Sequence, residues 1–356
     1  MKISSTQFRA IFLAILCAIA PFAHAQTTVA TDPVGFVTVS AAAGTGITRT
    51  VSVLSFPLVS PEAIAGVATG RLTGVTANSI SNSSAGWSPG ALSVAATPYV
   101  IRITSGAAKG HTFLISTSTQ NTETTVTIDS QDATQVDLTT LGIVTGASGD
   151  TYAIYACDTL STALGTPATT GVQGGVSASG NGADIVQMFV AGIWQQYYYN
   201  TSNLSWRRVG PNTLSDNVPI RPDSAVIYSR LAATPLNLTV LGAVPTSDRK
   251  VMVKNSGVSF ISNSWPTVIT LGTSAIHSIP GWASAANYDA ATTDIVQMMV
   301  NGIWVKYFYT GNNWKRVGPN TISDSVAIPV GSAFIIEKKT PASGSSHLVQ
   351  NIPYSL

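Results

Sequence analysis

Carboxylates at repeated positions are the first residues in this chain that could do chemistry. Four aspartates recur at matched places in two copies of an internal repeat: Asp184, Asp216, Asp294 and Asp324. Two carboxylates hydrolyse a glycosidic bond only when a cleft holds them at a set separation. A repeated aspartate beside a repeated arginine, here Arg208 or Arg316, more simply fixes a turn or forms an ion pair. We favour this structural interpretation.

Histidine, the usual general base, is scarce. His111, His277 and His347 are the histidines beyond residue 25, and they lie far apart and outside the repeated blocks. The spacings typical of zinc proteases, of the serine nucleophile elbow, of phosphate-binding loops and of paired-cysteine metal sites do not occur. The sequence therefore predicts no catalytic residue and no cofactor, and a secreted hydrolase is only the second alternative.

Three further aspartates, Asp129, Asp132 and Asp137, could offer oxygen ligands to calcium in an extracellular protein. They do not follow a recognised calcium-loop pattern. Aspartate is also a frequent turn residue, because its side chain bonds nearby backbone groups. We expect turns here rather than a metal site.

Tryptophans give the sharper sign of a binding function. Those at matched places in the two copies are Trp194, Trp206, Trp304 and Trp314. An exposed aromatic ring can stack on the apolar face of a sugar, whereas a buried ring supplies core area. We favour the core interpretation and keep these four residues as candidate glycan-stacking positions.

An internal repeat organises the C-terminal part of the chain. Residues 184–193 recur at 294–303 with eight of ten positions identical, and residues 206–218 recur at 314–326 with ten of thirteen identical. Repetition of this kind indicates that one supersecondary unit has been copied. Each copy is predicted to begin near residues 150 and 257.

Short strands are predicted within each copy. Residues 186–190 and 193–199 are rich in β-branched and aromatic residues, and Ala191-Gly192 separates them. The second copy has Asn301-Gly302 at this place, which favours a two-residue hairpin turn with positive φ. Further strands are expected at 206–209 and 225–229, and at 314–317 and 333–337. The two faces of residues 303–309 both carry aromatics, so periodicity does not show which is the core side.

The region from residue 32 to about 150 has no close copy. Residues 99–104, 111–116 and 124–129 are predicted strands. The expected fold is all-β: an N-terminal small β-barrel or sandwich domain followed by two homologous β-meander or sandwich units. The expected divisions are a signal peptide at 1–25, the N-terminal β-domain at 26–150, and repeat units at 151–250 and 251–356.

The first 25 residues have the layout of a secretory signal. Lys2 and Arg9 precede a short apolar run, Ile11 to Ala20, and Ala23-His24-Ala25 is typical of a signal peptidase site. The mature chain is predicted to start at Gln26 without lipid on Cys17, and to have no transmembrane segment. We expect it to be exported to the periplasm, the outer surface or the extracellular space.

Charge and cysteine content limit the partners. Removing Lys2 and Arg9 from the 18 basic residues leaves 16, against 16 acidic residues, and no basic run exists. A neutral surface gives no electrostatic case for nucleic acid or anionic membrane. Cys157 is the only cysteine beyond the signal, and Ser264 takes its place in the second copy. This favours an inert core residue.

Several blocks together resemble a family of secreted verrucomicrobial proteins of unknown function. They are residues 32–38, residues 99–106 with Gly110, the three tyrosines at 197–199 and the Trp-Arg-Arg-Val-Gly block at 206–210. The likeness spans most of the chain after the signal. It implies an exported β-protein and brings no catalytic residues.

The sequence favours a noncatalytic structural or adhesive component of the cell envelope or extracellular matrix. Its partners would be envelope components or polysaccharide, and self-association stays open. The first alternative is a carbohydrate-binding protein that uses the repeated aromatics. An outer-membrane barrel is less favoured, because regular ten-residue strands with aromatic girdles are not found in the sequence.

Overall fold

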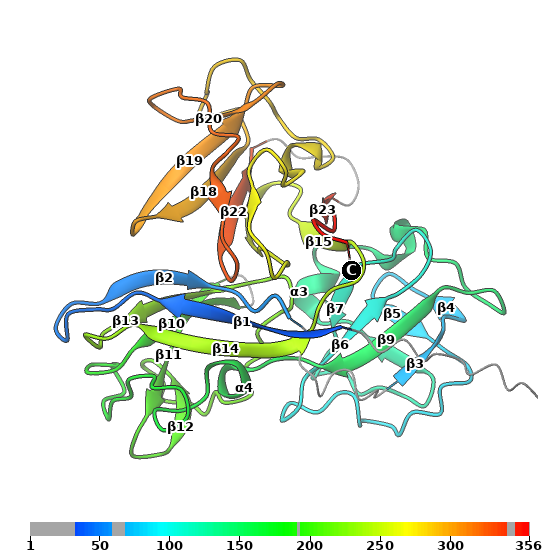
Figure 1. Ribbon diagram of the computed structural model, residues 1–356. Helices are drawn as coiled ribbons and strands as arrows, with labels where there is room; N and C mark the ends of the chain where they lie inside the picture. The colour runs from blue at the N-terminus through cyan, green and yellow to red at the C-terminus, as the bar shows by residue number, and fades with distance from the viewer. Residues whose placement is uncertain (1–32, 59–67, 191–192, 340–345, 356) are drawn as a thin grey trace, which may run out of the picture. The chain divides into compact units, whose positions relative to one another are not determined.

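Strands dominate the computed structural model, which describes residues 33–58, 68–190, 193–339 and 346–355 (Figure 1). Helices are short: α3 (Ser130–Ala133), α4 (Leu160–Leu164) and the 3-10 turns Leu138–Leu141 and Ile276–Ser278. The expected all-β fold class is confirmed. The predicted signal peptide, residues 1–25, and the predicted hairpin tip Ala191-Gly192 lie outside the described residues. In the part of the chain that is described, no helix has the length and apolar character needed to cross a membrane.

Residues 68–156 form a β-domain of two antiparallel sheets. The four-stranded sheet has the order β3 (Ala68–Arg71), β9 (Thr151–Ala156), β6 (Tyr99–Ile103), β7 (Thr112–Leu114). The three-stranded sheet has the order β4 (Gly74–Val75), β5 (Ser79–Ser81), β8 (Thr125–Thr127). Strands β6, β7 and β8 confirm the three segments predicted here. Trp87 and Tyr152 pack edge to face in the shared core, with ring centroids 5.9 Å apart.

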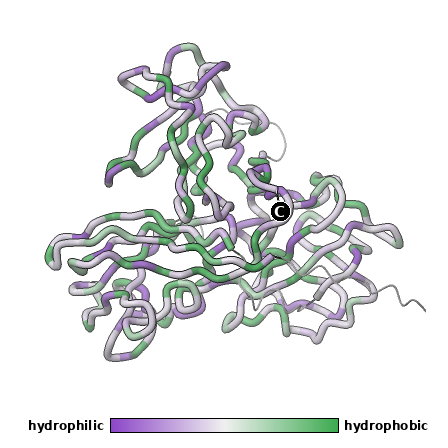
Figure 2. Tube along the Cα trace, viewed as in Figure 1, coloured by the Kyte–Doolittle hydropathy of each residue, from purple (hydrophilic) through white to green (hydrophobic). Residues whose placement is uncertain are grey.

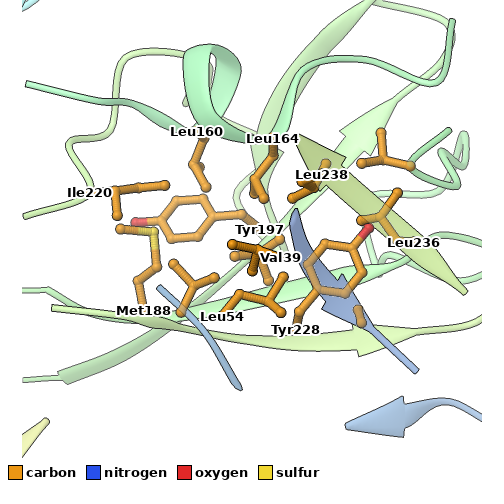
Figure 3. Packing of buried hydrophobic residues seen from close by; sticks show 14 of the residues in the cluster. Val39, Leu54, Leu160, Leu164, Met188, Tyr197, Ile220, Tyr228, Leu236 and Leu238 are labelled. Carbon is orange, nitrogen blue, oxygen red and sulfur yellow. The ribbon is translucent and has the colours of Figure 1, made fainter. Parts of the chain in front are cut away.

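The first repeat is a five-stranded sheet covered by a two-stranded ribbon. The sheet has the order β12 (Ser205–Arg208), β11 (Ile193–Asn200), β10 (Ile185–Val190), β13 (Val226–Arg230), β2 (Thr50–Leu54). The ribbon pairs β1 (Val34–Ala41) with β14 (Leu236–Ala243). Figure 3 shows Val39 and Leu238 of the ribbon packing with Tyr197 of the sheet and Leu164 of α4.

The position of β1 and β2 differs from the division expected from the sequence. That division placed residues 33–58 with the N-terminal domain, but Leu54 pairs with Val226, and Val39 pairs with Leu238, both in the first repeat. The β-domain of residues 68–156, hereafter the inserted domain, therefore interrupts the first repeat between β2 and β10. Strand pairing over such a sequence separation leaves no local signature, since any β-rich segment can complete a sheet edge.

The second repeat, residues 245–355, has the same strand order. Its sheet has the order β20 (Trp314–Arg316), β19 (Ile303–Tyr309), β18 (Ile295–Val300), β22 (Ala333–Lys338), β16 (Gly257–Ser262). Its ribbon pairs β15 (Arg249–Val253) with β23 (Ser346–Gln350), and β17 (Ile269–Thr270) pairs with β21 (Ala327–Ile328). Registers match as well: Val186 lies opposite Tyr197, and Val296 lies opposite Tyr307.

The predicted hairpin turn of the second repeat is confirmed. Asn301 and Gly302 have φ values of 51° and 78° and connect the paired residues Val300 and Ile303. Two consecutive positive φ angles match the twist of antiparallel strands. Hydrophobic and hydrophilic residues interleave along the strands (Figure 2). In β19, Val305 and Tyr307 belong to the core of the repeat, which settles the choice that periodicity left open.

Candidate functional site

Two of the four candidate tryptophans are core residues. Trp206 is 1% exposed and Trp314 is 0% exposed. The indole nitrogen of Trp206 donates a hydrogen bond to the Gly165 carbonyl, and its ring packs edge to face on Tyr199. Burial removes Trp206 and Trp314 from the glycan-stacking candidates, because a sugar cannot reach either ring. The core interpretation holds for this pair.

The other two tryptophans lie where the repeats meet. Trp194 is 45% exposed, and its ring packs edge to face against Phe189 at 5.5 Å and against Phe260 of the second repeat at 5.7 Å. Trp304 is half-buried against a cluster drawn from both repeats. That cluster also contains Val53, Ala225, Phe260, Met299 and Ala333. The repeated aromatics therefore hold the fold together, and only Trp194 keeps a sizeable exposed surface.

Asp184 and Asp294 are buried carboxylates that connect separate segments of each repeat. Asp184 accepts hydrogen bonds from the Gln173 and Leu231 amides and from Tyr228, and pairs with Arg230 at 2.5 Å. Burial and the neighbouring carboxylate raise the pKa of Tyr228. Asp294 accepts from the backbone amides of Ala283 and Lys339. Each carboxylate thus connects the loop before the hairpin to the end of the fourth strand.

The second repeated pair is also structural. Asp216 accepts the Trp206 amide at 2.7 Å, and Asp324 accepts the Trp314 amide at 2.8 Å. These bonds fix the turn that follows β12 or β20. The structural interpretation is confirmed: Asp216 and Asp324 hold turns, whereas Asp184 forms an ion pair, but not with the arginine expected from the sequence. Asp184 pairs with Arg230 and not with Arg208.

The three other aspartates each cap a helix or form an ion pair. Asp129 caps α3 through the Gln131 amide, and Asp137 caps the next 3-10 turn through the Thr139 amide. Arg221 bridges Asp129 at 2.6 Å and Asp132 at 2.5 Å. Burial raises the pKa of Asp132, while Arg221 opposes that rise. Within the described ranges no three His, Cys, Asp or Glu side chains form a metal-binding group.

The histidines are packed among aromatic rings. His111 is 2% exposed, stacks on Phe113 and meets His347 edge to face at 5.2 Å. Burial, His347 and Lys250 lower the pKa of His111 to about 3. His277 stacks on Tyr309 at 4.4 Å. These imidazoles contribute packing area to the fold.

Cys157 is a buried residue, but Ser264 is not its counterpart. The Leu160 and Leu271 amides donate to the equivalent carbonyls of Val218 and Val326, so the repeats are related here by a shift of 111 residues and not 107. The Cys157 thiol donates a hydrogen bond to the Ile220 carbonyl. Burial raises the pKa of the Cys157 thiol, so the reactive thiolate is disfavoured. The inert interpretation of this cysteine is supported by both observations.

A groove with a volume of about 490 Å³ lies between the inserted domain and the first repeat and is the candidate binding site. Its walls are mostly small or apolar side chains, among them Ala95, Pro98, Leu114, Met188, Val190 and Leu214. The volume is in the range of ligand pockets. Arg221 and Asp129 also line the groove and neutralise each other. The sequence did not indicate this groove, because the interruption of the first repeat creates it.

The groove offers apolar surface together with hydroxyl and amide groups, such as those of Thr117, Ser130 and Asn217. Such a lining suits noncovalent binding. Its charged groups are already engaged: Arg221 by two carboxylates, and Asp216 by the Trp206 amide. Comparison of the chain with protein-family models, with curated proteins and with solved structures gave no match.

Proposed function

We propose that this chain is a noncatalytic, exported component of the cell envelope or extracellular matrix with a structural or adhesive role. The observation that carries the proposal is that the duplicated aspartates form structural hydrogen bonds within each repeat. Asp184 and Asp294 bond backbone amides across each repeat, and Asp216 and Asp324 hold the turns. The duplication therefore copied residues that stabilise the fold, and two stable units provide a larger surface than one.

Export of the protein is part of the same proposal. The charged start, the apolar run and Ala23-His24-Ala25 support export, and the resemblance to secreted verrucomicrobial proteins agrees with it. N-terminal sequencing of exported material should find Gln26 first. Exported protein that retains Met1, or that carries lipid on Cys17, would contradict the predicted cleavage before Gln26.

Turnover assays test the noncatalytic role. Purified mature protein is incubated with polysaccharide, ester and peptide substrates, and no product is expected above the buffer rate. Surface labelling and cell fractionation, run in parallel, should place the protein at the envelope or outside the cell. Turnover that disappears in Asp129→Ala, while the circular dichroism spectrum is retained, would overturn the proposal in favour of a hydrolase.

Carbohydrate binding is the second candidate, and two observations favour it. Trp194 keeps exposed ring area, and the groove has a suitable volume with mixed apolar and polar walls. A glycan array should distinguish the two places. Loss of binding in Trp194→Ala assigns the ligand to the ring, whereas loss in Leu214→Asp assigns it to the groove. Ile322→Asp is the matched control, because Ile322 occupies the equivalent exposed position in the second repeat.

A further inference from the structure

The two sheets can be compared residue by residue. Residues 206–218 of the first repeat recur at 314–326 of the second, so equivalent residues in this part differ by 108 in number. Val226 and Phe334 are therefore equivalent. Val226 pairs with Leu54, and Phe334 pairs with Ile261. Leu54 and Ile261 are therefore equivalent. The fifth strands β2 and β16 correspond even though their sequences do not reveal it.

The same reasoning identifies the other equivalent pairs used below. They are Val53 with Phe260, Ser55 with Ser262, Phe189 with Met299, Trp194 with Trp304, Asp223 with Gly331, and Ala225 with Ala333.

Backbone hydrogen bonds between the repeats are reciprocal. The Ser55 amide at the end of β2 donates to the Gly331 carbonyl at 2.8 Å. The Ser262 amide at the end of β16 donates to the Asp223 carbonyl at 3.1 Å. Each repeat thus gives the other the same donor and the same acceptor. Two copies in a head-to-tail arrangement would make one of these bonds and not both.

Side-chain contacts between the repeats are reciprocal as well. Trp194 of the first repeat packs on Phe260 of the second. In the cluster shared by the repeats, Trp304 of the second lies with Val53, the first-repeat equivalent of Phe260. Ala225 and Ala333 are equivalent, and both belong to that cluster. Equivalent residues meet each other only close to a two-fold axis.

We infer that the two repeats form an internal isologous pair, related by a pseudo-two-fold axis near Ala225 and Ala333. The surface that each repeat uses here fits one kind of partner, another copy of the same repeat, and the chain supplies that partner itself. Isologous contacts close on themselves, whereas head-to-tail contacts extend into filaments. The pair is therefore complete at two copies, and this surface does not polymerise the protein.

The inserted domain breaks the symmetry without using this surface. Its Gly110 carbonyl accepts the Lys250 amide of the second repeat, and its Asp129 and Asp132 hold Arg221 of the first. The pairing of the repeats holds whether or not the chain binds a glycan.

Double-mutant cycles in the full chain test the pairing. The cross-repeat cycles combine Trp194→Ala with Phe260→Ala, and Trp304→Ala with Val53→Ala. In each, the double variant should lose less in urea midpoint than the sum of the single losses. The matched control combines Trp194→Ala with Val53→Ala. Three strand-to-strand steps separate these two residues in the first sheet, so their losses should add.

Additive losses in either cross-repeat cycle, or equal coupling in the control cycle, would overturn the pairing. Where an alanine variant does not fold, Trp→Leu at the same position replaces it. Sedimentation of the unmodified chain gives an independent result. A dimer or polymer that dissociates on Trp304→Arg would show that the surface is open to other chains, and would also overturn the inference.

Discussion

Acidification to about pH 5 should destabilise the folded chain through His111. This imidazole is 2% exposed and lies among Phe113, His347 and the Lys250 ammonium. Its Nδ1 atom has no hydrogen-bond partner among the residues that the structure describes. A proton added there would be a buried charge beside a second cation. Burial, His347 and Lys250 accordingly lower the pKa of His111 from 6.5 to about 3.

The sign and size of the effect follow from this lowered pKa. Between pH 6.5 and pH 3 the unfolded chain binds a proton at His111 that the folded chain does not, so stability falls as the pH falls. At about pH 5 the folded imidazole is still neutral, and the loss depends only on the unfolded pKa. It amounts to roughly 2 kcal/mol relative to about pH 7.5. Burial and Lys250 also lower the pKa of His347, which adds loss in the same direction.

Urea unfolding at both pH values measures this loss in the unmodified chain and in His111→Phe. Phenylalanine keeps the ring that stacks on Phe113 and removes the titrating nitrogen. The free energy of unfolding of His111→Phe should depend on pH less steeply, by roughly 2 kcal/mol over this interval. Phe113→Leu is the control, because it should lower stability equally at both values. Parallel pH profiles for the unmodified chain and His111→Phe would refute the reasoning.

Three substitutions test the assignments of structural roles. Trp206→Ala and Trp314→Ala should each cost roughly 3–5 kcal/mol of unfolding free energy, because each removes a fully buried ring; a melting curve that does not move would return that ring to the binding candidates. Asp184→Asn should cost roughly 3–5 kcal/mol by leaving Arg230 buried and unpaired, as urea unfolding would measure. Gly302→Val should cost roughly 1 kcal/mol or more, since φ is positive there, and an unchanged urea midpoint would argue against that turn.

Local structure could be predicted wherever the sequence carries a local signal. Asn301-Gly302 between two β-rich runs specified the hairpin, and the repeated aspartates next to turn residues were assigned to turns. Both predictions depend on local properties: Asn and Gly tolerate positive φ, and an aspartate side chain bonds backbone groups close to it in sequence. The expectation that Cys157 is an inert buried residue agrees with the structure, but its pairing with Ser264 was wrong, because loops of different length change the shift between the repeats to 111 residues at Leu160 and Leu271.

Long-range pairing could not be predicted in this way. Residues 50–54 complete the sheet of the first repeat from across the inserted domain, and their sequence shows only that they favour a strand. The same limit explains the tryptophans. Trp206 and Trp194 belong to the same hairpin region and are equally repeated, but one fills a core and the other meets Phe260 of the neighbouring repeat. Repetition shows that a ring is retained and does not show what it contacts.

The positions where the copies differ follow from what each loop must contact. Asp223 in the first repeat approaches Arg249 at 3.8 Å, and burial raises the pKa of Asp223. Its equivalent Gly331 has φ of 69°, and a Cβ atom there would lie 2.7 Å from Val39. An aspartate at 331 would therefore clash, while a glycine at 223 would leave Arg249 without its carboxylate. The two repeats have diverged at this position because their loops meet different partners.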